Sequence, residues 1–163
     1  RTIDNTTVYA NNYEYSNIRS WLNNEFYNSA FAFNNSYIST TMVENVSTTT
    51  DSSNSEFECN DTNDKVYLPS YVDYFNTDYG FEWERYNTSK TRECKTTDYA
   101  RARGAWCSKD TSGLKNNGSY WTRSPSSEFS YCAWNVNSAG YLSSYAVDGE
   151  SHCVRPCINI TLA

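Results

Sequence analysis

The sequence has few aliphatic side chains. Leucine, isoleucine, valine and phenylalanine together make up only 25 of its 163 residues. A highly charged chain in which these residues make up less than about 20% is expected to be disordered. The charge is moderate, however, and the chain carries 15 tyrosines, 5 tryptophans and 6 cysteines, residue types that disordered chains lack. We therefore expect residues 1–163 to fold as a single domain with an aromatic, cross-linked core.

Basic side chains are also scarce. The 13 lysines and arginines face 19 aspartates and glutamates, which leaves a net charge of −6. Nucleic acids and anionic membrane surfaces are bound through basic footprints, so the composition excludes both as partners. No apolar run approaches the roughly 18 residues of a membrane span, and no signal-peptide pattern opens the chain. We expect a soluble domain, mature or excised, without membrane insertion.

Side chains that carry catalytic chemistry are few as well. The one histidine, His152, lies beside a cysteine at a predicted turn into a strand, where an exposed polar role is the expected one. Residues 60–64 cluster oxygen ligands but lack the glycine and the glutamate of an EF-hand loop. No spacing of acidic residues nominates a glycosidase pair. The sequence thus predicts no enzyme, no metal site and no cofactor; an acid pair or a reactive cysteine assembled by folding is the alternative.

The cysteines are even in number and form no paired CxxC motif of the kind that binds zinc. Cys153 and Cys157 are four residues apart, which in a strand separates them by about 13 Å, too far to bond each other. An even set in a chain with a weak core indicates disulfides and an oxidising compartment. We therefore predict a disulfide-stabilised, extracellular or cell-surface protein, with reduced thiols as the alternative. The predicted disulfide cysteines are Cys59, Cys94, Cys107, Cys132, Cys153 and Cys157.

Two to three short helices are predicted before the last third of the chain. Apolar residues recur at helical spacing over residues 16–30, and Ser16 or Asn17 caps the start. These apolar residues are Ile18, Trp21, Leu22 and Phe26. Residues 69–75 open on a proline, which suits a first helical turn, and a third helix is expected over residues 97–103.

The other predicted elements are a surface loop and strands. The loop covers residues 45–63, and the strands cover residues 65–68, 120–123, 131–136, 141–147 and 153–161. Ser124-Pro125 is expected to break the second strand, and residues 137–140 have the composition of a hairpin turn. Helices followed by a C-terminal antiparallel meander indicate an α+β fold.

The last third of the chain interleaves aromatic residues with serine and asparagine. Tyrosine and tryptophan supply large contact areas, and serine and asparagine supply adaptable hydrogen bonds, as in antibody paratopes. Aromatic faces beside polar groups also suit sugar rings. Alternate strand residues face the core, so part of the set is expected to be buried. The predicted ligand-binding residues are Tyr131, Trp134, Asn135, Asn137, Tyr141, Ser143, Tyr145 and Asp148.

Several segments in order along the chain resemble an uncharacterised bacterial domain family that is common in gut Firmicutes. The matching segments are Tyr15–Tyr27, Asp64–Tyr71, Thr91-Arg92, Thr97–Ala100, Tyr120–Pro125, Ala133 with Val136, Gly140 and Val154–Pro156. That family is similar to C-type-lectin-like domains of the formylglycine-generating-enzyme type, which also frame the variable proteins of diversity-generating retroelements. The resemblance implies a C-type-lectin-like ligand-binding scaffold, with exposed residues between Ser126 and Ser151 as the variable surface.

The chain departs from that family at two cysteines and at the first strand, and it departs from calcium lectins at Val136. Cys153 and Cys157 stand where the family has glycine and alanine, on the final strand, so the oxidase chemistry of formylglycine-generating enzymes is not carried over. Val136 follows Trp134-Asn135 where calcium lectins have aspartate, which argues against a calcium site. The family's first strand has no match, which leaves room for strand addition by another copy of the chain.

Taken together, these features predict an extracellular adhesion or recognition module that binds a protein or a glycan. The alternative is a structural subunit of an extracellular filament or surface assembly, whose partners are other copies of the chain. The missing first strand and the uncharged polar surface favour this alternative.

Overall fold

The first helical stretch begins at the predicted cap. In the computed structural model, which describes residues 1–33, 35–46, 56–111 and 113–161, Ser16 Oγ accepts a hydrogen bond from the Arg19 amide at 3.1 Å. The stretch consists of α1 (Asn17–Trp21), the π-helical segment η1 (Leu22–Phe26) and α2 (Tyr27–Ala30). This confirms the predicted helix. Leu22 is fully buried, but Trp21 is 38% exposed, so its expected place in the core is wrong.

The other helices are short. The predicted helix over 97–103 is confirmed as α3 (Asp98–Ala102), which Thr97 caps. The predicted helix over 69–75 shrinks to the 3-10 turn η4 (Asp73–Phe75), because Ser70 and Asp73 cap each other: the Ser70 amide donates to Asp73 Oδ2 and the Asp73 amide donates to Ser70 Oγ. Two further 3-10 turns are η2 (Asn35–Tyr37) and η5 (Thr77–Tyr79).

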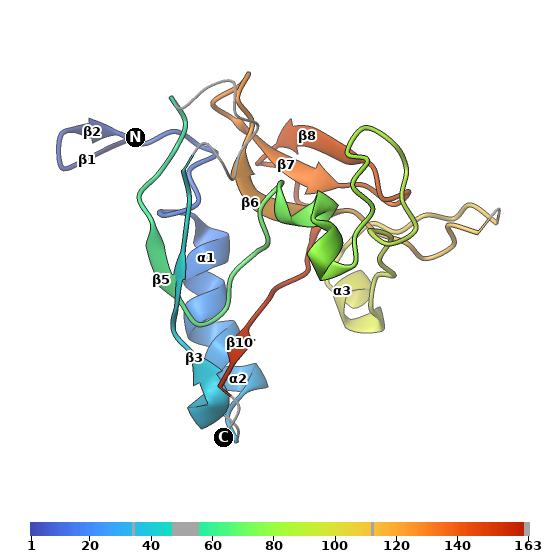
Figure 1. Ribbon diagram of the computed structural model, residues 1–163, viewed down its shortest axis with the longest axis horizontal. Coiled ribbons are helices and arrows are strands. Elements are labelled where there is room, and N and C mark those ends of the chain that lie inside the picture. Colours follow the sequence, from blue (N-terminus) through green and yellow to red (C-terminus); the bar gives the residue numbers. More distant parts are fainter. Residues whose placement is uncertain (34, 47–55, 112, 162–163) are drawn as a thin grey trace.

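The described strands form four sheets, and three of these contain two strands each (Figure 1). The pairs are β1 (Thr2–Ile3) with β2 (Thr6–Thr7), β3 (Ile38–Ser39) with β10 (Asn159–Ile160), and β4 (Thr41–Val43) with β5 (Thr62–Asp64). The central sheet has the order β8-β7-β6-β9, from β6 (Tyr120–Pro125), β7 (Cys132–Val136), β8 (Leu142–Ala146) and β9 (Cys153–Val154). Strands β6 to β8 are the predicted antiparallel meander, and β9 pairs with β6 in parallel.

Two strand predictions are corrected at the ends of this sheet. Ser124-Pro125 does not break β6, because a bulge between Trp121 and Pro125 lets Pro125 pair with Ala133. The predicted strand over 153–161 is two strands. Strand β9 joins the central sheet, whereas β10 lies near α2 and pairs with β3 (Figure 1).

Residues 65–68 are not a strand either. Asn23 Oδ1 accepts hydrogen bonds from the amides of Lys65 and Val66, so a helix side chain takes the place of a neighbouring strand. Tyr67 forms a single antiparallel bridge to Cys157. Of the predicted loop over 45–63, residues 47–55 lie outside the described residues, and its end enters β5.

The predicted disulfides are not formed. Cys59, Cys94, Cys107, Cys132, Cys153 and Cys157 are all free thiols. The backbones of Cys153 and Cys157 pair with Tyr120 and Tyr67 respectively, so these two cysteines serve as β-pairing positions. Burial raises the pKa of Cys59, Cys132, Cys153 and Cys157, which favours the unreactive thiol form. The fold is therefore held by packing and hydrogen bonds.

The central sheet has a core on each face, and both are aromatic as expected. One face packs against the long helical stretch, through the buried residues Tyr13, Leu22, Tyr27, Ile38, Val66, Leu68, Trp121 and Ala133. The other packs against η4, through Tyr71, Tyr74, Tyr120, Val136 and Leu142. Neighbouring residues Tyr120 and Trp121 thus point into different cores, as alternation along a strand requires.

A buried ion pair fastens the helical stretch to β5. Arg19 Nε and Nη2 each lie 2.8 Å from Asp64 Oδ1, and the Asp64 side chain has no exposed surface. Thr62 Oγ1 donates a further hydrogen bond to Asp64 Oδ2 at 2.8 Å. The carboxylate is thereby paired and hydrogen-bonded, which offsets its removal from water.

A second buried arginine organises the irregular chain between η4 and β6. Arg92 is fully buried and has no carboxylate within ion-pair distance among the described residues. Its guanidinium donates instead to the carbonyls of Tyr74, Glu82, Glu84, Asn87 and Gly140, at 2.7 to 3.3 Å. One side chain therefore joins η4, the following loop and the turn between β7 and β8.

Gly140 is required at that turn for two reasons. Its φ of +73° lies in the left-handed region, which favours glycine. A Cβ at this position would also overlap the carbonyl group of Ser89. The Ser89 amide donates to Ala139 O at 3.1 Å, so the two segments are in backbone contact.

Gly140→Ala is expected to lower the free energy of unfolding by about 3 kcal/mol, since a left-handed alanine costs about 1–2 kcal/mol and overpacking about 1–3 kcal/mol more. Gly80→Ala is the matched control, because Gly80 has a φ of +82° and no atom within 4 Å of an added Cβ. We expect the control to lose only the cost of an alanine in the left-handed conformation, about 1–2 kcal/mol. Chemical denaturation measures both, and equal losses would contradict the close approach to Ser89.

Candidate functional site

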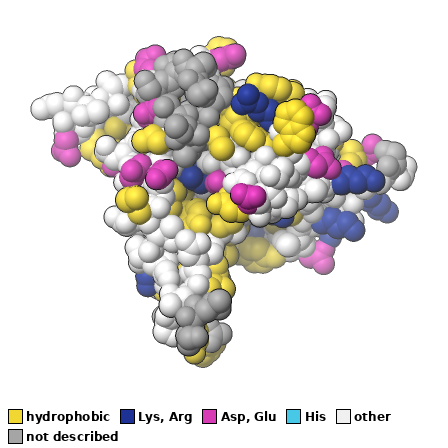
Figure 2. Space-filling model, viewed as in Figure 1, with side chains coloured by type: hydrophobic (Ala, Val, Ile, Leu, Met, Phe, Trp, Pro, Cys, Tyr) yellow, Lys and Arg dark blue, Asp and Glu magenta, His cyan; other side chains and the backbone are white. Residues whose placement is uncertain are grey.

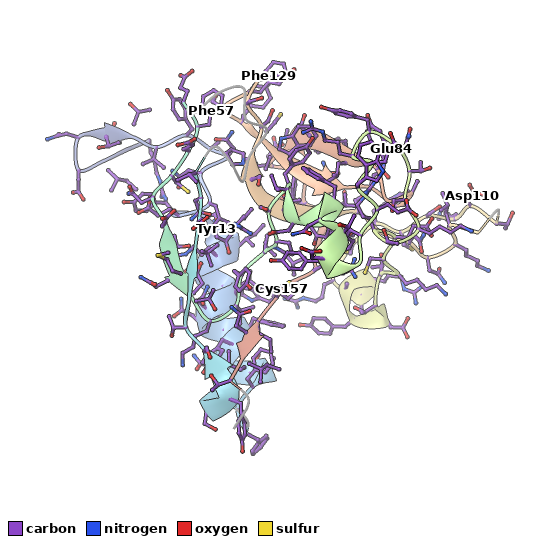
Figure 3. All side chains as sticks on the ribbon, in the orientation of Figure 1. Tyr13, Phe57, Glu84, Asp110, Phe129 and Cys157 are labelled. Carbon is purple, nitrogen blue, oxygen red and sulfur yellow. The ribbon has the colours of Figure 1, made fainter. Side chains whose placement is uncertain are left out.

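A cleft of about 510 Å³ opens between the N-terminal segment and the central sheet; we call it the N-terminal cleft. Residues 8–18 form one wall, and Leu68, residues 121–123, Ala133 and Val147 form the other. Its floor is buried, and Figure 3 shows Tyr13 above the first turn of α1. Clefts of this size that combine aromatic surface with a few polar groups are the usual ligand sites of proteins.

Aromatic rings line much of this cleft. They belong to Tyr9, Tyr13, Tyr15 and Trp121. Tyr9 is held by an edge contact with Phe57 at 4.9 Å between ring centroids and by its hydroxyl, which donates to Glu56 Oε1. Burial raises the pKa of Tyr13, so its hydroxyl stays protonated while it accepts a hydrogen bond from the Leu68 amide at 3.4 Å. Tyr15 is exposed at the rim.

Asn11 fixes the position of the N-terminal wall. Its Nδ2 donates to the carbonyls of Phe129 and Cys132 at 3.1 and 3.0 Å, and its amide donates to Ser130 O. Figure 3 shows Phe129, in the loop between β6 and β7, at the upper end of the molecule. Asn11 Oδ1 is buried and has no hydrogen-bond partner among the described residues. The hydrogen bonds of Asn11 hold the N-terminal wall against the start of β7 and the loop before it.

The floor of the cleft rests on a stack of rings. The His152 ring stacks on Trp121 with centroids 4.4 Å apart, and the centroid of the Tyr145 ring lies 5.0 Å from that of His152. His152 Nδ1 is buried without a partner among the described residues, and burial lowers the pKa of the imidazole. His152 is therefore a packing element behind Trp121, in place of the exposed polar role expected from the sequence.

Three of the predicted ligand-binding residues are exposed near this stack. Tyr131 and Tyr145 are each about half exposed, at 53% and 54%, and Asp148 lies in the turn after β8. The Tyr131 carbonyl accepts a hydrogen bond from the amide of Val147, which lines the cleft. These residues form a surface beside the N-terminal cleft.

The other predicted residues are engaged in the fold. Asn135 is buried, and its Oδ1 accepts a hydrogen bond from Ser143 Oγ. Asn137 Oδ1 closes the hairpin turn by accepting from the amides of Ala139 and Tyr141. Tyr141 itself is half-buried.

Trp134 lies on the opposite face of the sheet from Asn135. Its ring packs on Tyr71, with centroids 4.3 Å apart, and is half-buried. The structure therefore does not bring the eight predicted residues together as one surface.

The N-terminal wall was not predicted as part of a site. Its sequence nevertheless carried the same signal as the last third of the chain, because residues 9–17 interleave three tyrosines with asparagines and serine. Contact of this segment with β6 and β7 is long-range, so only the fold reveals it.

Metal chemistry finds little support in the described part of the chain. No group of three or more histidine, cysteine, aspartate or glutamate side chains among the described residues is arranged to hold an ion. In the oxygen-rich segment 60–64, Asp61 Oδ1 accepts from the Asn45 amide, and Asp64 is paired with Arg19. Among the described helices, none has the length and apolar character that crossing a bilayer requires.

The lowered pKa of His152 predicts a pH-dependent stability. The unfolded state has the higher pKa, near the ordinary 6.5, so it takes up the proton first as the pH falls. The contribution of neutral His152 to the free energy of unfolding is present in full above about pH 6.5 and is lost as the pH falls through the folded-state pKa. We expect His152→Phe, which keeps a stacking ring without titration, to show a smaller drop in Tm than the wild type between about pH 7.5 and pH 5. Parallel declines in the two proteins would contradict this assignment.

Comparison with known proteins places the chain in a family. Residues 1–162 match a family described as a domain of unknown function, DUF6273. No curated protein and no solved structure matches the chain. Since the match includes the N-terminal wall, the central sheet and the cleft between them, the chain as a whole belongs to the DUF6273 family.

Proposed function

We propose that the chain is an extracellular ligand-binding module that binds a glycan in the N-terminal cleft and serves adhesion or recognition. The observation that carries the proposal is a cleft lined by tyrosine and tryptophan rings together with asparagine and serine residues. Amide and hydroxyl groups can donate hydrogen bonds to sugar hydroxyls and accept hydrogen bonds from them. Aromatic rings supply the apolar contact area that such ligands need.

The polar groups of the cleft favour a neutral ligand. Arg123 lines it, but its guanidinium donates to the carbonyls of Leu68 and Glu44 and pairs with Asp73 at 3.1 Å. Arg1 Nη2 donates to the Tyr15 carbonyl at the rim. Tyr15 and Asn17, which are exposed, remain for recognition as uncharged side chains of the cleft.

The wider protein is consistent with an extracellular location. Its surface is polar but mostly uncharged, rich in serine, threonine and asparagine. Because the cysteines are free thiols, disulfides do not support an extracellular location. The inference of that location therefore rests on the composition of the surface. The resemblance to C-type-lectin-like domains adds support for a binding scaffold.

A second candidate function is a structural subunit that assembles with copies of itself. Strands β1 and β2 form a hairpin that stands off the body in Figure 1, with positive φ angles at Asp4 and Asn5 in its turn. Strand β8 is the edge of the central sheet, with β7 as its single neighbour among the described strands. Exposed strand edges are templates for pairing between chains.

The glycan proposal is tested on a glycan array with two double variants. Tyr15→Ala with Asn17→Ala removes exposed groups of the cleft, and we expect it to weaken binding of the selected glycan by about tenfold. Tyr131→Ala with Tyr145→Ala tests the neighbouring surface. Tyr99→Ala, an exposed tyrosine on α3, is the control and should leave binding within about twofold.

Three results would contradict the cleft as a glycan site. The first is that no glycan on the array is bound. The second is loss of binding in the Tyr131 and Tyr145 variant alone, which would place the site on the surface that these two tyrosines form beside the cleft. The third is an equal loss in the Tyr99 control.

Self-assembly is tested by analytical ultracentrifugation. If β8 pairs between chains, the wild type should sediment as oligomers, and Ser144→Lys should shift it to monomer because an edge lysine opposes pairing. Asn28→Lys adds the same charge to an exposed site on α2 and should leave the oligomers intact. A monodisperse wild-type monomer would rule out this function.

A further inference from the structure

A second hollow, of about 560 Å³, lies on another part of the molecule between β4, η4 and the chain that leads to β10. We call it the Arg155 groove. Cys157, labelled in Figure 3, marks it on the segment that descends to β10, and Figure 2 shows hydrophobic side chains with a basic group in the middle of the same face. The groove does not depend on the glycan proposal.

Arg155 is a half-buried cation without a counterion. Its guanidinium lies 5.6 Å from the ring centre of Tyr120 and 5.9 Å from that of Phe81. Its one hydrogen bond to the described residues runs from Nη1 to Tyr120 Oη, at 3.3 Å. No described carboxylate lies within 4.0 Å of it, whereas Arg19 and Arg123 are each paired with an aspartate. Most of its donors are therefore free, on a charge that burial makes costly to leave unpaired.

A second donor without a partner belongs to Tyr74, a buried residue that lines the groove. The residue is 1% exposed, and its hydroxyl has no hydrogen-bond partner among the described residues. Burial raises the pKa of Tyr74 well above its ordinary value, and the nearby charge of Arg155 opposes that shift only in part. The phenol therefore keeps its proton and can donate it.

The other charged groups of the groove set the charge of the ligand. Asp73 is neutralised by Arg123, with which it forms an ion pair at 3.1 Å. Glu44 is exposed at the margin. One cation thus remains unpaired beside one exposed anion, which favours a singly charged anion over a multiply charged phosphate.

We propose that Arg155 and Tyr74 bind the carboxylate of a small organic acid, whose apolar body lies against Phe81, Met42 and Ile158. A guanidinium fork and a phenol O–H supply donors that match the lone pairs of a carboxylate. Phe81, Met42 and Ile158 line the same groove and supply apolar contact. The same chemistry is present at the C-terminus of a peptide, so the probes include both forms.

The test follows amide shifts of the ¹⁵N-labelled chain by NMR during titration. The probes are phenylacetate, its uncharged analogue phenylacetamide, N-acetylphenylalanine as a peptide end, and inorganic phosphate. We expect saturable shifts at groove residues with phenylacetate, at a Kd of about 1 mM for a ligand of this size. Tighter binding of N-acetylphenylalanine than of phenylacetate would identify a peptide end as the form bound. Phenylacetamide and phosphate should bind at least about tenfold more weakly.

Two variants and a control make the test specific. Arg155→Gln is expected to weaken phenylacetate binding by about tenfold, and Tyr74→Phe by about threefold. Tyr74→Phe removes only an unpartnered hydroxyl, so its Tm should not fall, which keeps the test valid if Arg155→Gln folds poorly. Arg85→Gln removes the same charge from an exposed site outside the groove and should leave binding unchanged.

The proposal is overturned if phenylacetate gives no saturable shift in the groove. It is also overturned if phenylacetamide binds as well as phenylacetate, or if Arg85→Gln reduces binding as much as Arg155→Gln. Glycan binding in the N-terminal cleft is measured separately, so either result leaves the other proposal standing.

Discussion

The irregular half of the chain depends on the burial of one charged side chain. Between η4 and β6 the described residues form two regular elements, η5 and α3, and Arg92 supplies the contacts that neighbouring strands or helices would otherwise provide. Hydrogen bonds from a charged donor are each worth about 1.5–3 kcal/mol. Every acceptor is a backbone carbonyl, which any residue type provides. Apart from Gly140, the loops around Arg92 are therefore free to differ in side chains while the frame that holds them stays the same.

Local signals in the sequence were sufficient for the parts of the fold that local interactions build. The cap at Ser16, the helix α3 and the turn that ends at Gly140 all lie where the sequence predicts them. The errors concern long-range partners. Residues 65–68 have strand composition but pair with the Asn23 side chain, and the last strand is divided between β6 and β3. The cysteine count suggested cross-links, but six thiols can equally serve as small buried residues.

The sequence predicted the types of residue that form the candidate site better than it predicted where in the fold the site lies. Aromatic residues interleaved with serine and asparagine indicate a recognition surface wherever they are exposed. In β7 the alternation of side chains buries Asn135 and turns Trp134 onto Tyr71, whereas Tyr131, before β7, and Tyr145, in β8, are exposed. The concave site arises where residues 8–18 cross this sheet. Because that contact spans more than a hundred residues of sequence, as the bond from Asn11 to Phe129 does, no local pattern encodes it.

Strand β6 has large aromatic side chains on both faces, and this bears on how uniquely the sheet can assemble. A shift of one residue against β7 would exchange Tyr120 and Trp121 between the two cores. Tyr120 would lose its hydrogen bond to the Arg92 carbonyl, and Trp121 would lose its stack with His152. Both losses destabilise the shifted pairing of β6 with β7. The two adjacent rings of Tyr120 and Trp121 therefore favour a single strand register.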